Sequence, residues 1–308
     1  MIMKNLCLLL AAGVLSNAQS AYTYDSGGHL VKITYGSAGT VTYSYDAAGN
    51  LTGRSATTTT KSVITSVSTA NGPSTIAQNT YIVVKGTNLV PATTPAAGAI
   101  WSTAPSFASG QMPTQLNGVS VTVNGKAAYV YFFCSAATSS VCASDQINIL
   151  TPLDGTIGPV PIVVTSGSTS SAPFTVTMQT VVPSFLLFPN NYVAATHING
   201  SLLGLTTLYP GASTPAQPGE EVVIYAVGFG LPSTPLSPGS AAQSGSLPSL
   251  PVCTIGSNQV SVAFAGLISP GLYQLNISIP QATSAGDQPI SCTYAGQSTP
   301  VGDLITVN

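Results

Sequence analysis

The segment Asp145-Gln-Ile-Asn-Ile-Leu-Thr-Pro152 recurs 128 positions later as Tyr273-Gln-Leu-Asn-Ile-Ser-Ile-Pro280. Polar and apolar residues alternate in both copies, and both copies end at a proline. Alternation with a period of two is typical of a half-buried β-strand. Proline has no N–H to donate to a β-ladder, so it is typical of the end of a strand. The two segments therefore predict the same strand in two copies of one β module.

The sequence on the amino-terminal side of this strand is repeated as well. Residues 121–132 parallel residues 253–264, and residues 81–89 parallel residues 222–231. The offset between the copies varies from about 128 to 142, which indicates insertions in the loops. Turns rich in Gly, Pro and Asn separate the segments, and none has the i, i+3, i+4, i+7 spacing of a helix at convincing length.

These short strands predict an all-β protein. Each half closes on an alternating strand, at residues 174–178 and 304–307. Regularly spaced short strands in a unit of this size favour an antiparallel sandwich of immunoglobulin type. We therefore expect two tandem immunoglobulin-like β-sandwiches, the first over residues 62–178 and the second over residues 179–308.

A shorter repeat lies nearer the amino terminus. Tyr22-Thr-Tyr-Asp-Ser-Gly-Gly-His-Leu30 recurs 21 positions later as Tyr43-Ser-Tyr-Asp-Ala-Ala-Gly-Asn-Leu51. Alternating Tyr and Thr followed by Asp-x-x-Gly predicts strand, turn and strand. These residues resemble the YD repeats of Rhs-type proteins, whose many copies coil into β-strand shells. Two copies are fewer than the three that usually bury a core. Residues 22–56 are therefore predicted to form a short β-hairpin ribbon, followed by a polar linker at 57–61.

The motifs of the larger repeat, in their order, also resemble a known family. The first half is similar to IPT/TIG-like immunoglobulin modules in Gly-Thr-Asn-Leu (86–89), Val-Thr-Val-Asn-Gly-Lys-Ala-Ala (121–128) and Gln-Ile-Asn-Ile-Leu-Thr-Pro (146–152). The second half resembles an uncharacterised C-terminal module of secreted acidobacterial proteins in Pro218-Gly-Glu-Glu-Val-Val-Ile-Tyr225 and Gly228-Phe-Gly-Leu-Pro232. The resemblance implies a fold and a surface location, and it transfers no catalytic residue.

Charge is scarce in this chain. Of its 308 residues, 6 are Lys or Arg and 8 are Asp or Glu, while 44% are hydrophobic. Six cations cannot form the basic patch that binding to nucleic acid requires. Residues 1–21 have the pattern of a secretory signal peptide: Lys4, then about ten apolar residues, then small residues. Because about twenty apolar residues are needed to cross a bilayer, we expect a secreted, extracellular or cell-surface protein without membrane insertion after cleavage.

The cysteines predict disulfides. Beyond the predicted signal peptide the chain has Cys134, Cys142, Cys253 and Cys292. An even number in an exported protein is typical of disulfide bonds. The pairs Cys134–Cys142 and Cys253–Cys292 are favoured because each stays within one predicted sandwich. A metal site is disfavoured because there is no Cys-x-x-Cys and only two histidines are present. We expect no metal and no cofactor.

No catalytic constellation is recognisable. Asp25 and Asp46 lie in the repeat turns, where Asp typically caps its own backbone. Glu220 and Glu221 precede an apolar strand and are predicted to be solvated. His197 precedes an Asn-Gly turn and is predicted to be exposed. Because neither the nucleophile elbow Gly-x-Ser-x-Gly nor a phosphate-binding loop occurs, we expect no catalytic residue and a non-enzymatic protein.

Two functional hypotheses remain. The first is a structural or adhesion protein that associates with itself or with other surface proteins through its sheets, with strand addition by residues 22–54 as the mechanism. The alternative is a carbohydrate-binding module that uses Trp101 in the loop 92–110 together with exposed tyrosines, because flat rings stack on sugars. A structural role of Trp101 stays open. If Trp101 binds glycan from an exposed loop, Trp101→Ala abolishes retention without loss of stability.

Overall fold

The computed structural model describes residues 20–35, 39–58, 61–69, 72 and 74–308. Contacts divide the chain into two compact units, Met1–Lys61 and Ser62–Asn308. The expected signal peptide lies outside the described residues except for its last two positions, and residues 59–60 of the expected linker lie outside them as well. Within the described residues, no helix is long and apolar enough to cross a membrane.

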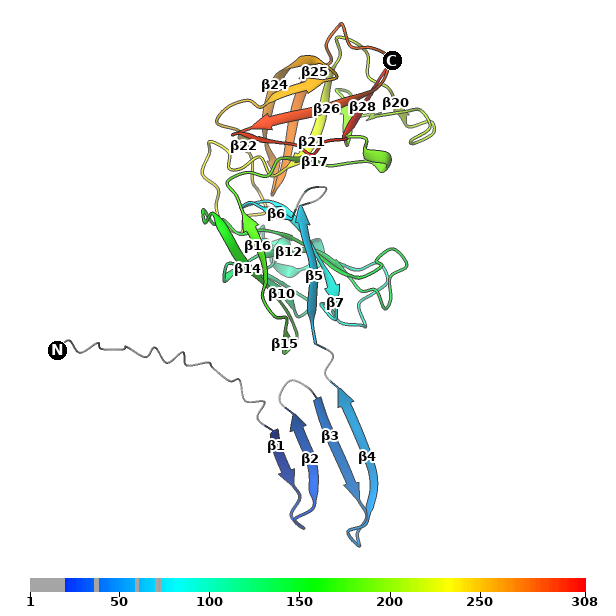
Figure 1. Cartoon of the computed structure of the whole chain (residues 1–308), viewed down its shortest axis with the longest axis vertical. Coiled ribbons are helices and arrows are strands. Elements are labelled where there is room, and N and C mark those ends of the chain that lie inside the picture. The colour runs from blue at the N-terminus through cyan, green and yellow to red at the C-terminus, as the bar shows by residue number, and fades with distance from the viewer. Residues whose placement is uncertain (1–19, 36–38, 59–60, 70–71, 73) are drawn as a thin grey trace, which may run out of the picture. The chain divides into compact units, whose positions relative to one another are not determined.

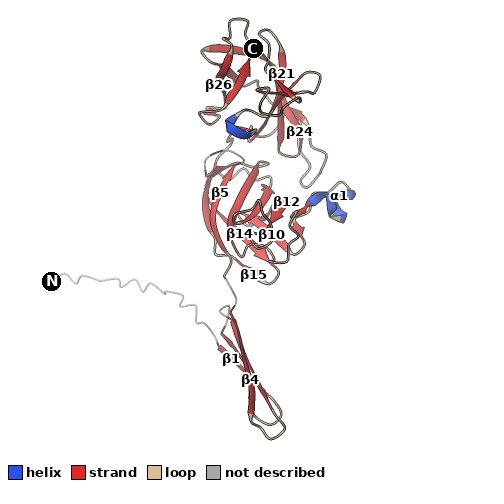
Figure 2. Cartoon of the chain, turned by 90° about the vertical axis from the view of Figure 1, so that its right-hand side faces the viewer, coloured by secondary structure: helices blue, strands red, loops and turns tan. Residues whose placement is uncertain are grey.

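The first unit is one antiparallel sheet with the strand order β1-β2-β3-β4 (Figure 1). Its strands are β1 (Ser20–Tyr24), β2 (Leu30–Tyr35), β3 (Gly39–Tyr45) and β4 (Leu51–Thr58). Figure 2 shows that this sheet is a single layer. The short repeat therefore forms two hairpins, β1-β2 and β3-β4, as its Asp-x-x-Gly turns predict.

Each hairpin turn is closed by its aspartate. Asp25 Oδ1 accepts hydrogen bonds from the backbone N–H groups of Gly27 (2.9 Å) and His29 (2.8 Å). Asp46 Oδ1 accepts the same two bonds one repeat later, from Ala48 (2.9 Å) and Asn50 (2.8 Å). The pKa of the Asp46 carboxyl is held below its ordinary value by the Asn50 side-chain N–H, which donates to Oδ2 (3.0 Å), together with these backbone bonds. For Asp25 the backbone bond from His29 has the largest part in the same lowering of the pKa. The two aspartates are thus turn caps, as the sequence indicated.

The second unit begins with a sandwich of two sheets. One has the order β5 (Val63–Thr69), β7 (Tyr81–Thr87), β13 (Asp145–Leu150), β12 (Tyr129–Cys134) and β8 (Ala99–Ile100). The other has the order β11 (Lys126–Ala127), β10 (Val119–Val123), β14 (Gly158–Ser166), β16 (Phe174–Met178) and β6 (Thr75–Ile76), with β9 (Gln115–Leu116) beside β10 and β15 (Thr169–Ser170) beside β14. Two short helices, η2 (Trp101–Thr103) and α1 (Pro105–Ala108), follow β8. Strict alternation in the strands gives each sheet one buried face, as in β10, where every second residue is buried.

A second sandwich follows in the same unit. Its strands connect in the order β20 (Ser213–Thr214), β19 (Leu202–Leu203), β18 (Ala195–His197), β21 (Glu221–Val227), β25 (Leu272–Ser278), β24 (Asn258–Ser269), β23 (Val252–Ile255), β26 (Gly286–Tyr294) and β27 (Gln297–Ser298). β17 (Ser184–Phe185), β22 (Gly245–Ser246) and β28 (Leu304–Val307) pair beside this path, and η3 (Pro189–Asn191) lies between β17 and β18. The long strand β24 links both layers because it pairs with β25 and with β23.

Each sandwich has its own hydrophobic core. Buried residues between Ile64 and Met178 form one cluster, and buried residues between Val181 and Val307 form the other. The protein is therefore all-β, with two tandem immunoglobulin-like sandwiches and an amino-terminal hairpin sheet, as the sequence predicts.

The two sandwiches are structural copies. The strand order β7-β13-β12 in the first corresponds to β21-β25-β24 in the second. In β13 the Gln146 side-chain N–H donates to Asn148 Oδ1 (2.9 Å), and in β25 Gln274 donates in the same way to Asn276 (2.7 Å). The strand registers make Glu221 the structural equivalent of Tyr81. The sequence comparison matches residue 81 with residue 222, so the structure shifts this alignment by one position.

Two disulfides are present, Cys134–Cys142 and Cys253–Cys292. This is the pairing that the sequence favours. Cys253 and Cys292 face each other directly on β23 and β26, with their Cα atoms 4.0 Å apart. The corresponding pair in the first sandwich is Val121 on β10 and Val164 on β14. The disulfide thus replaces a cross-strand valine pair inside the second core.

Candidate functional site

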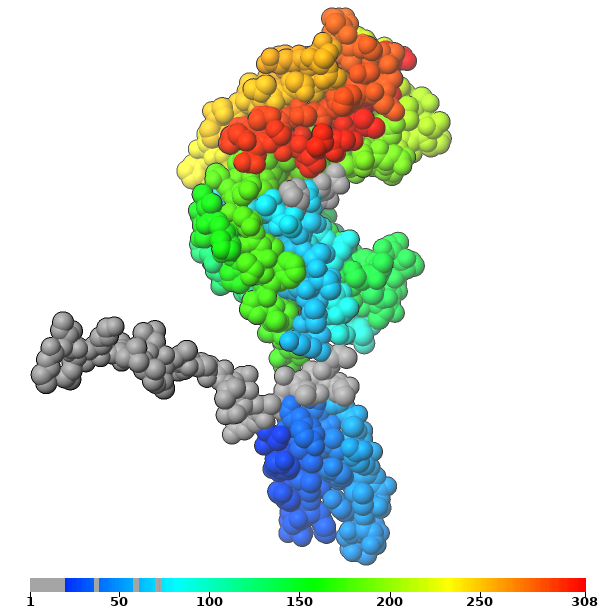
Figure 3. All heavy atoms as spheres, viewed as in Figure 1, coloured from blue at the N-terminus to red at the C-terminus, as the bar shows by residue number. Residues whose placement is uncertain are grey.

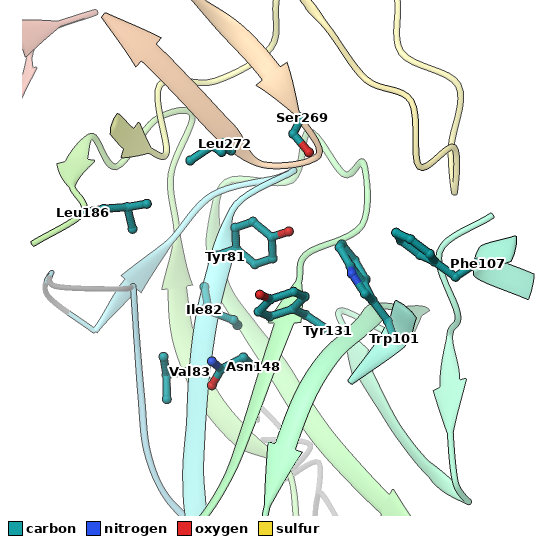
Figure 4. A pocket seen from close by; sticks show the side chains of 10 residues that line it. All are labelled: Tyr81, Ile82, Val83, Trp101, Phe107, Tyr131, Asn148, Leu186, Ser269 and Leu272. Atoms are coloured by element: carbon teal, nitrogen blue, oxygen red, sulfur yellow. The ribbon is translucent and has the colours of Figure 1, made fainter. Parts of the chain in front are cut away.

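An aromatic pocket lies on the outer face of the β7-β13-β12 sheet (Figure 4). Its volume is about 450 Å³, and its walls include the rings of Tyr81, Trp101, Phe107 and Tyr131. The mouth is completed from the second sandwich by Leu186, Ser269 and Leu272. The pocket therefore exists only where the two sandwiches of the second unit meet.

Alternation along β7 places Tyr81 in this pocket. Ile82 and Val84 are fully buried in the sandwich core, so Tyr81 and Val83 lie on the opposite face. The Tyr81 ring lies beside Tyr131, with ring centres 5.3 Å apart and an edge-to-face angle of 61°.

A β-bulge places Tyr131. On β12, Val130 pairs with Ile149 and Phe132 pairs with Asn148, so Tyr131 is an extra residue without a partner on β13. A bulge bends the strand and turns the extra side chain in a new direction. Here the Tyr131 ring meets Trp101 at 4.9 Å and 82°, an edge-to-face contact.

The loop after β8 supplies the outer wall. Trp101 begins η2, whose turn is closed by the Ala104 N–H donating to Trp101 O (2.9 Å). Pro105 then starts α1, where its fixed φ suits the first helical position. Phe107 on α1 stacks on Trp101 with ring centres 5.3 Å apart and planes 27° apart.

The pocket is uncharged and keeps free hydrogen-bonding groups. No charged residue is among its walls. Among the described residues, the hydroxyl groups of Tyr81, Tyr131 and Ser269 have no hydrogen-bond partner, whereas Asn148 Oδ1 accepts from Gln146. Burial, together with the neighbouring Tyr131 phenol, raises the pKa of Tyr81. Tyr81 is therefore a neutral donor at physiological pH.

Trp101 is largely buried and does not present a freely exposed ring face for stacking. It is 7% exposed and packs on Met112, Tyr129 and Leu150. Sequence reasoning placed it in a loop of small residues and left open both a core role and a binding role. The structure places it in the pocket wall with most of its surface against the protein. The expectation that Trp101→Ala leaves stability unchanged conflicts with this burial, because removing a buried ring leaves a cavity.

Sequence reasoning missed the part of Tyr81 and Tyr131 in this pocket. The spacing of Tyr129 and Tyr131 predicts that both pack into the core from one strand face, but the bulge separates them: Tyr129 is 9% exposed, and Tyr131 is half-buried at the pocket. One signal was available. The copy of Tyr131 in the second half is Ala263, so an aromatic residue is present in only one of two otherwise similar strands.

A second polar cluster joins His197, Glu220 and Thr214. His197 Nδ1 is 2.5 Å from Glu220 Oε1, and His197 Nε2 is 2.9 Å from Thr214 Oγ1. The side chains of His197 and Glu220 are 12% and 21% exposed. The predictions that His197 is exposed and Glu220 solvated are therefore wrong, because strand β20 and the turn before β21 fold over the histidine.

This cluster has the residue types of a hydrolytic triad. His197 Nε2 lies 2.9 Å from Thr214 Oγ1 and 3.1 Å from the backbone oxygen of Thr214, which can only accept. When Nε2 carries the proton, it donates to this oxygen and cannot take the proton of the Thr214 hydroxyl. Glu220 Oε2 accepts from the Gln217 N–H (2.8 Å), so the carboxylate also ties the turn to the strand. The arrangement fits a structural clamp.

Metal ligands do not gather in the part of the chain that the structure describes. There, no group of three or more His, Cys, Asp or Glu side chains is placed to hold an ion.

The family model named RHS Repeat matches residues 24–61, in agreement with the YD repeat that the sequence predicts. No curated protein sequence matches the chain. A solved structure with similarity is SGBP-B of the Bacteroides ovatus mixed-linkage glucan utilization locus, in complex with a mixed-linkage heptasaccharide. The identity is 8%, the coverage is 96% of this chain and 62% of that chain, and the TM-score is 0.33.

Two further solved structures are similar at the same low level. SGBP-B from a xyloglucan utilization locus of Bacteroides uniformis has 15% identity over 79% of this chain and 49% of that chain, with a TM-score of 0.23. The adhesin InvE of Yersinia pseudotuberculosis has 9% identity over 80% of this chain and 58% of that chain, with a TM-score of 0.21. This chain thus spans 62% and 49% of the two SGBP-B proteins. Similarity of this strength assigns neither a ligand nor a function.

Proposed function

We propose that this chain is an exported, non-enzymatic adhesion or binding protein of the cell surface, and that its aromatic pocket holds a carbohydrate. One observation carries the proposal. The hydroxyl groups of Tyr81 and Tyr131 have no hydrogen-bond partner among the described residues. Both line a pocket whose walls are aromatic and carry no charged side chain.

The chemistry of the pocket matches the chemistry of a neutral sugar. A pyranose presents a face of C–H groups that packs on aromatic rings, and a rim of hydroxyl groups that needs donors and acceptors. Tyr81, Tyr131 and Ser269 offer hydroxyl groups around such rings. A charged ligand would find no partner among these walls, and desolvating its charge there would be costly.

The volume of the pocket agrees with a small part of a glycan chain. About 450 Å³ lies within the range of roughly 300–1,000 Å³ that ligand sites occupy. The mouth between the two sandwiches is open, so a longer polysaccharide would enter with one or two sugar units and continue outside.

Export and the domain assignment belong to the same proposal. Two disulfides are typical of an oxidising compartment, and residues 1–21 have the signal-peptide pattern. We assign residues 62–178 and 179–308 to two immunoglobulin-like modules of IPT/TIG type, the second resembling the acidobacterial C-terminal module.

The experiment uses the exported chain on an array of neutral polysaccharides, followed by titration with the best-retained one. Trp101 is the single tryptophan of the chain, so occupation of the pocket changes the intrinsic fluorescence. Tyr131→Phe keeps the ring and removes one hydroxyl group. It should weaken binding about fivefold, the value of one hydrogen bond.

Tyr225→Phe is the matched control. Tyr225 lies half-buried on β21 of the second sandwich and does not line the pocket. This variant should bind as the unchanged chain does. Retention of no polysaccharide, or equal weakening by both variants, would overturn the proposal.

A further inference from the structure

Equivalent residues of the repeat are half-buried in the interior of the β1–β4 sheet and exposed on its edge strands. Across the join between β2 and β3, the Tyr45 hydroxyl donates to Leu30 O (3.0 Å), and both side chains are half-buried. The repeat copies of these residues are Tyr24 on β1 and Leu51 on β4. Tyr24 is 59% exposed and Leu51 is 56% exposed, because each lies on a margin strand that lacks the neighbour its copy has.

The two hairpins are copies in register as well as in sequence. Tyr22 pairs with Ile33 in the first hairpin, and 21 positions later Tyr43 pairs with Arg54. The register shift after Thr23 recurs after Ser44. In the repeat, β3 is the copy of β1, and β4 is the copy of β2. The free edge of β4 can therefore pair with β1 of a second chain in the same way as β2 pairs with β3.

Among the described residues of this unit, β1 pairs only with β2 and β4 pairs only with β3, so each has one unpaired edge. Figure 3 shows β1 and β4 at the two margins of the sheet. β1 has no charged residue and no proline, and Arg54 is the one charged residue of β4. Proteins usually protect sheet edges with charges, prolines or bulges. Here β4 has Arg54 and one irregularity at Thr52, and β1 has neither a charge nor a proline.

We propose that copies of this chain associate head to tail, with β1 of one copy adding antiparallel to β4 of the next in the register that joins β3 to β2. Ile33 faces Val41 and Lys32 faces Thr42 at the internal join. The same register places Arg54 opposite Ser20 of the next copy, and Gly53 opposite Ala21 of the next copy.

The hydrogen bond of the internal join has a counterpart in this register. The Tyr24 hydroxyl of the added copy donates to Leu51 O, as Tyr45 donates to Leu30 O. Tyr24 and Leu51, which are 59% and 56% exposed on the edge strands, then lie against each other. Another copy of the chain is the partner that carries the matching strand.

Association of this kind is open-ended. The two surfaces that meet, one at β1 and one at β4, are different, so each added copy leaves a free β4 or a free β1. A symmetric dimer through two β1 strands would instead use one surface twice and stop.

Directional cross-linking tests the proposal in the full chain cleaved after Ala18, so that Ser20 and Ala21 of β1 are retained. One variant carries Ala21→Cys, and the other carries Gly53→Cys with Ser44→Ala, because a Cβ at Gly53 would lie 2.6 Å from the Ser44 hydroxyl oxygen. The four cysteines of the described residues are paired, so each introduced thiol is the reactive one. We expect a cross-linked dimer when the two variants are mixed and none from either variant alone.

A chain that carries all three substitutions should give a ladder of cross-linked oligomers. Dimers from the Ala21→Cys variant alone would show a symmetric join and overturn the proposal. So would a mixture that forms no cross-link while light scattering reports only monomer at the highest soluble concentration.

A hydroxyl deletion tests the register independently. Tyr24→Phe should weaken the association of the otherwise unchanged chain about fivefold, the value of one hydrogen bond. Tyr22→Phe is the control, since Tyr22 lies on the same strand and is 56% exposed, and its copy Tyr43 makes no side-chain hydrogen bond among the described residues. Equal effects of the two variants would overturn the proposed register.

Discussion

Tyr131 of the first sandwich and Ala263 of the second are the extra residues of two equivalent β-bulges. Around this position the backbones agree and the side chains differ. Where the first sandwich has Tyr81 on β7, the second has Glu221 on β21, which accepts a hydrogen bond from Asn276 (3.0 Å). One copy of the module therefore carries an aromatic outer face, and the other carries a polar one.

Trp101→Ala should destabilise the chain. Trp101 is 7% exposed, and its truncation leaves a cavity among Met112, Tyr129 and Leu150. The expected loss in the free energy of unfolding is about 3–5 kcal/mol, measured by urea denaturation followed by circular dichroism. Trp101→Phe should cost less than half as much. A loss below about 1 kcal/mol for the alanine variant would show that the ring is not packed as described.

Replacing the disulfide Cys253–Cys292 by two valines should lower the free energy of unfolding, mainly because the unfolded chain regains the entropy that the cross-link removes. The substitution restores the side chains that the first sandwich has at Val121 and Val164, so the packing loss is small. The bridged residues are 39 positions apart, for which the chain-entropy model gives roughly 4 kcal/mol.

The disulfide Cys134–Cys142 serves as the comparison. Its residues are 8 positions apart, and the same model gives roughly 2.5 kcal/mol for its removal. The order of the two losses, measured by urea denaturation of both double variants, checks the account. A larger loss at the shorter loop would contradict it.

Glu220→Gln should weaken the clamp on His197. The substitution keeps the size of the side chain but removes the charge that faces His197 Nδ1 at 2.5 Å. Because the pair is largely buried, we expect a loss of about 1–2 kcal/mol in unfolding free energy. Glu221→Gln, at the exposed next position, should change it by less than about 0.5 kcal/mol. Equal losses in thermal and urea unfolding would count against the clamp.

Asp303 should make stability fall as the pH rises. The residue is 2% exposed, Oδ2 has no hydrogen-bond partner among the described residues, and burial raises its pKa to about 6. The folded chain therefore binds this proton more tightly than the unfolded chain, whose value is near 3.8. The contribution of Asp303 to stability is therefore most favourable below about pH 4, declines between pH 4 and 6, and stays lower above.

Asp303→Asn removes this dependence. Two pKa units correspond to about 3 kcal/mol, so the variant should be more stable than the unchanged chain at pH 7 by up to that amount. The advantage should vanish near pH 4. A difference that is the same at pH 4 and pH 7, in urea denaturation at both values, would be incompatible with a buried ionised Asp303.

Strands β13 and β25 show what a local pattern can predict. Their alternating residues and closing prolines lie within eight consecutive positions, and the structure has a strand at each. The hairpins of the first unit were predictable for the same reason, because Asp25 and Asp46 bond to backbone groups no more than four residues away.

The pocket shows where local patterns fail. The segment Tyr-Val-Tyr-Phe-Phe at 129–133 does not reveal which residue the bulge leaves unpaired, since that depends on how β12 fits against β13. His197 was misjudged for a similar reason. Its neighbours in sequence form an exposed turn, but Thr214 of β20 and Glu220 of the turn before β21, which cover it, come from later in the chain.

The all-β class, the two tandem modules, the hairpin repeat and the favoured cysteine pairs follow from the sequence, because alternation, turn residues and repeats are properties of neighbouring positions. The pocket formed by Tyr81, Trp101, Phe107 and Tyr131 and the cover over His197 depend on how the chain packs in three dimensions. These contacts join residues up to 50 positions apart in the chain, through strand register, a bulge and the meeting of two sandwiches. No local pattern encodes such an arrangement, because it arises only when the whole cores have packed.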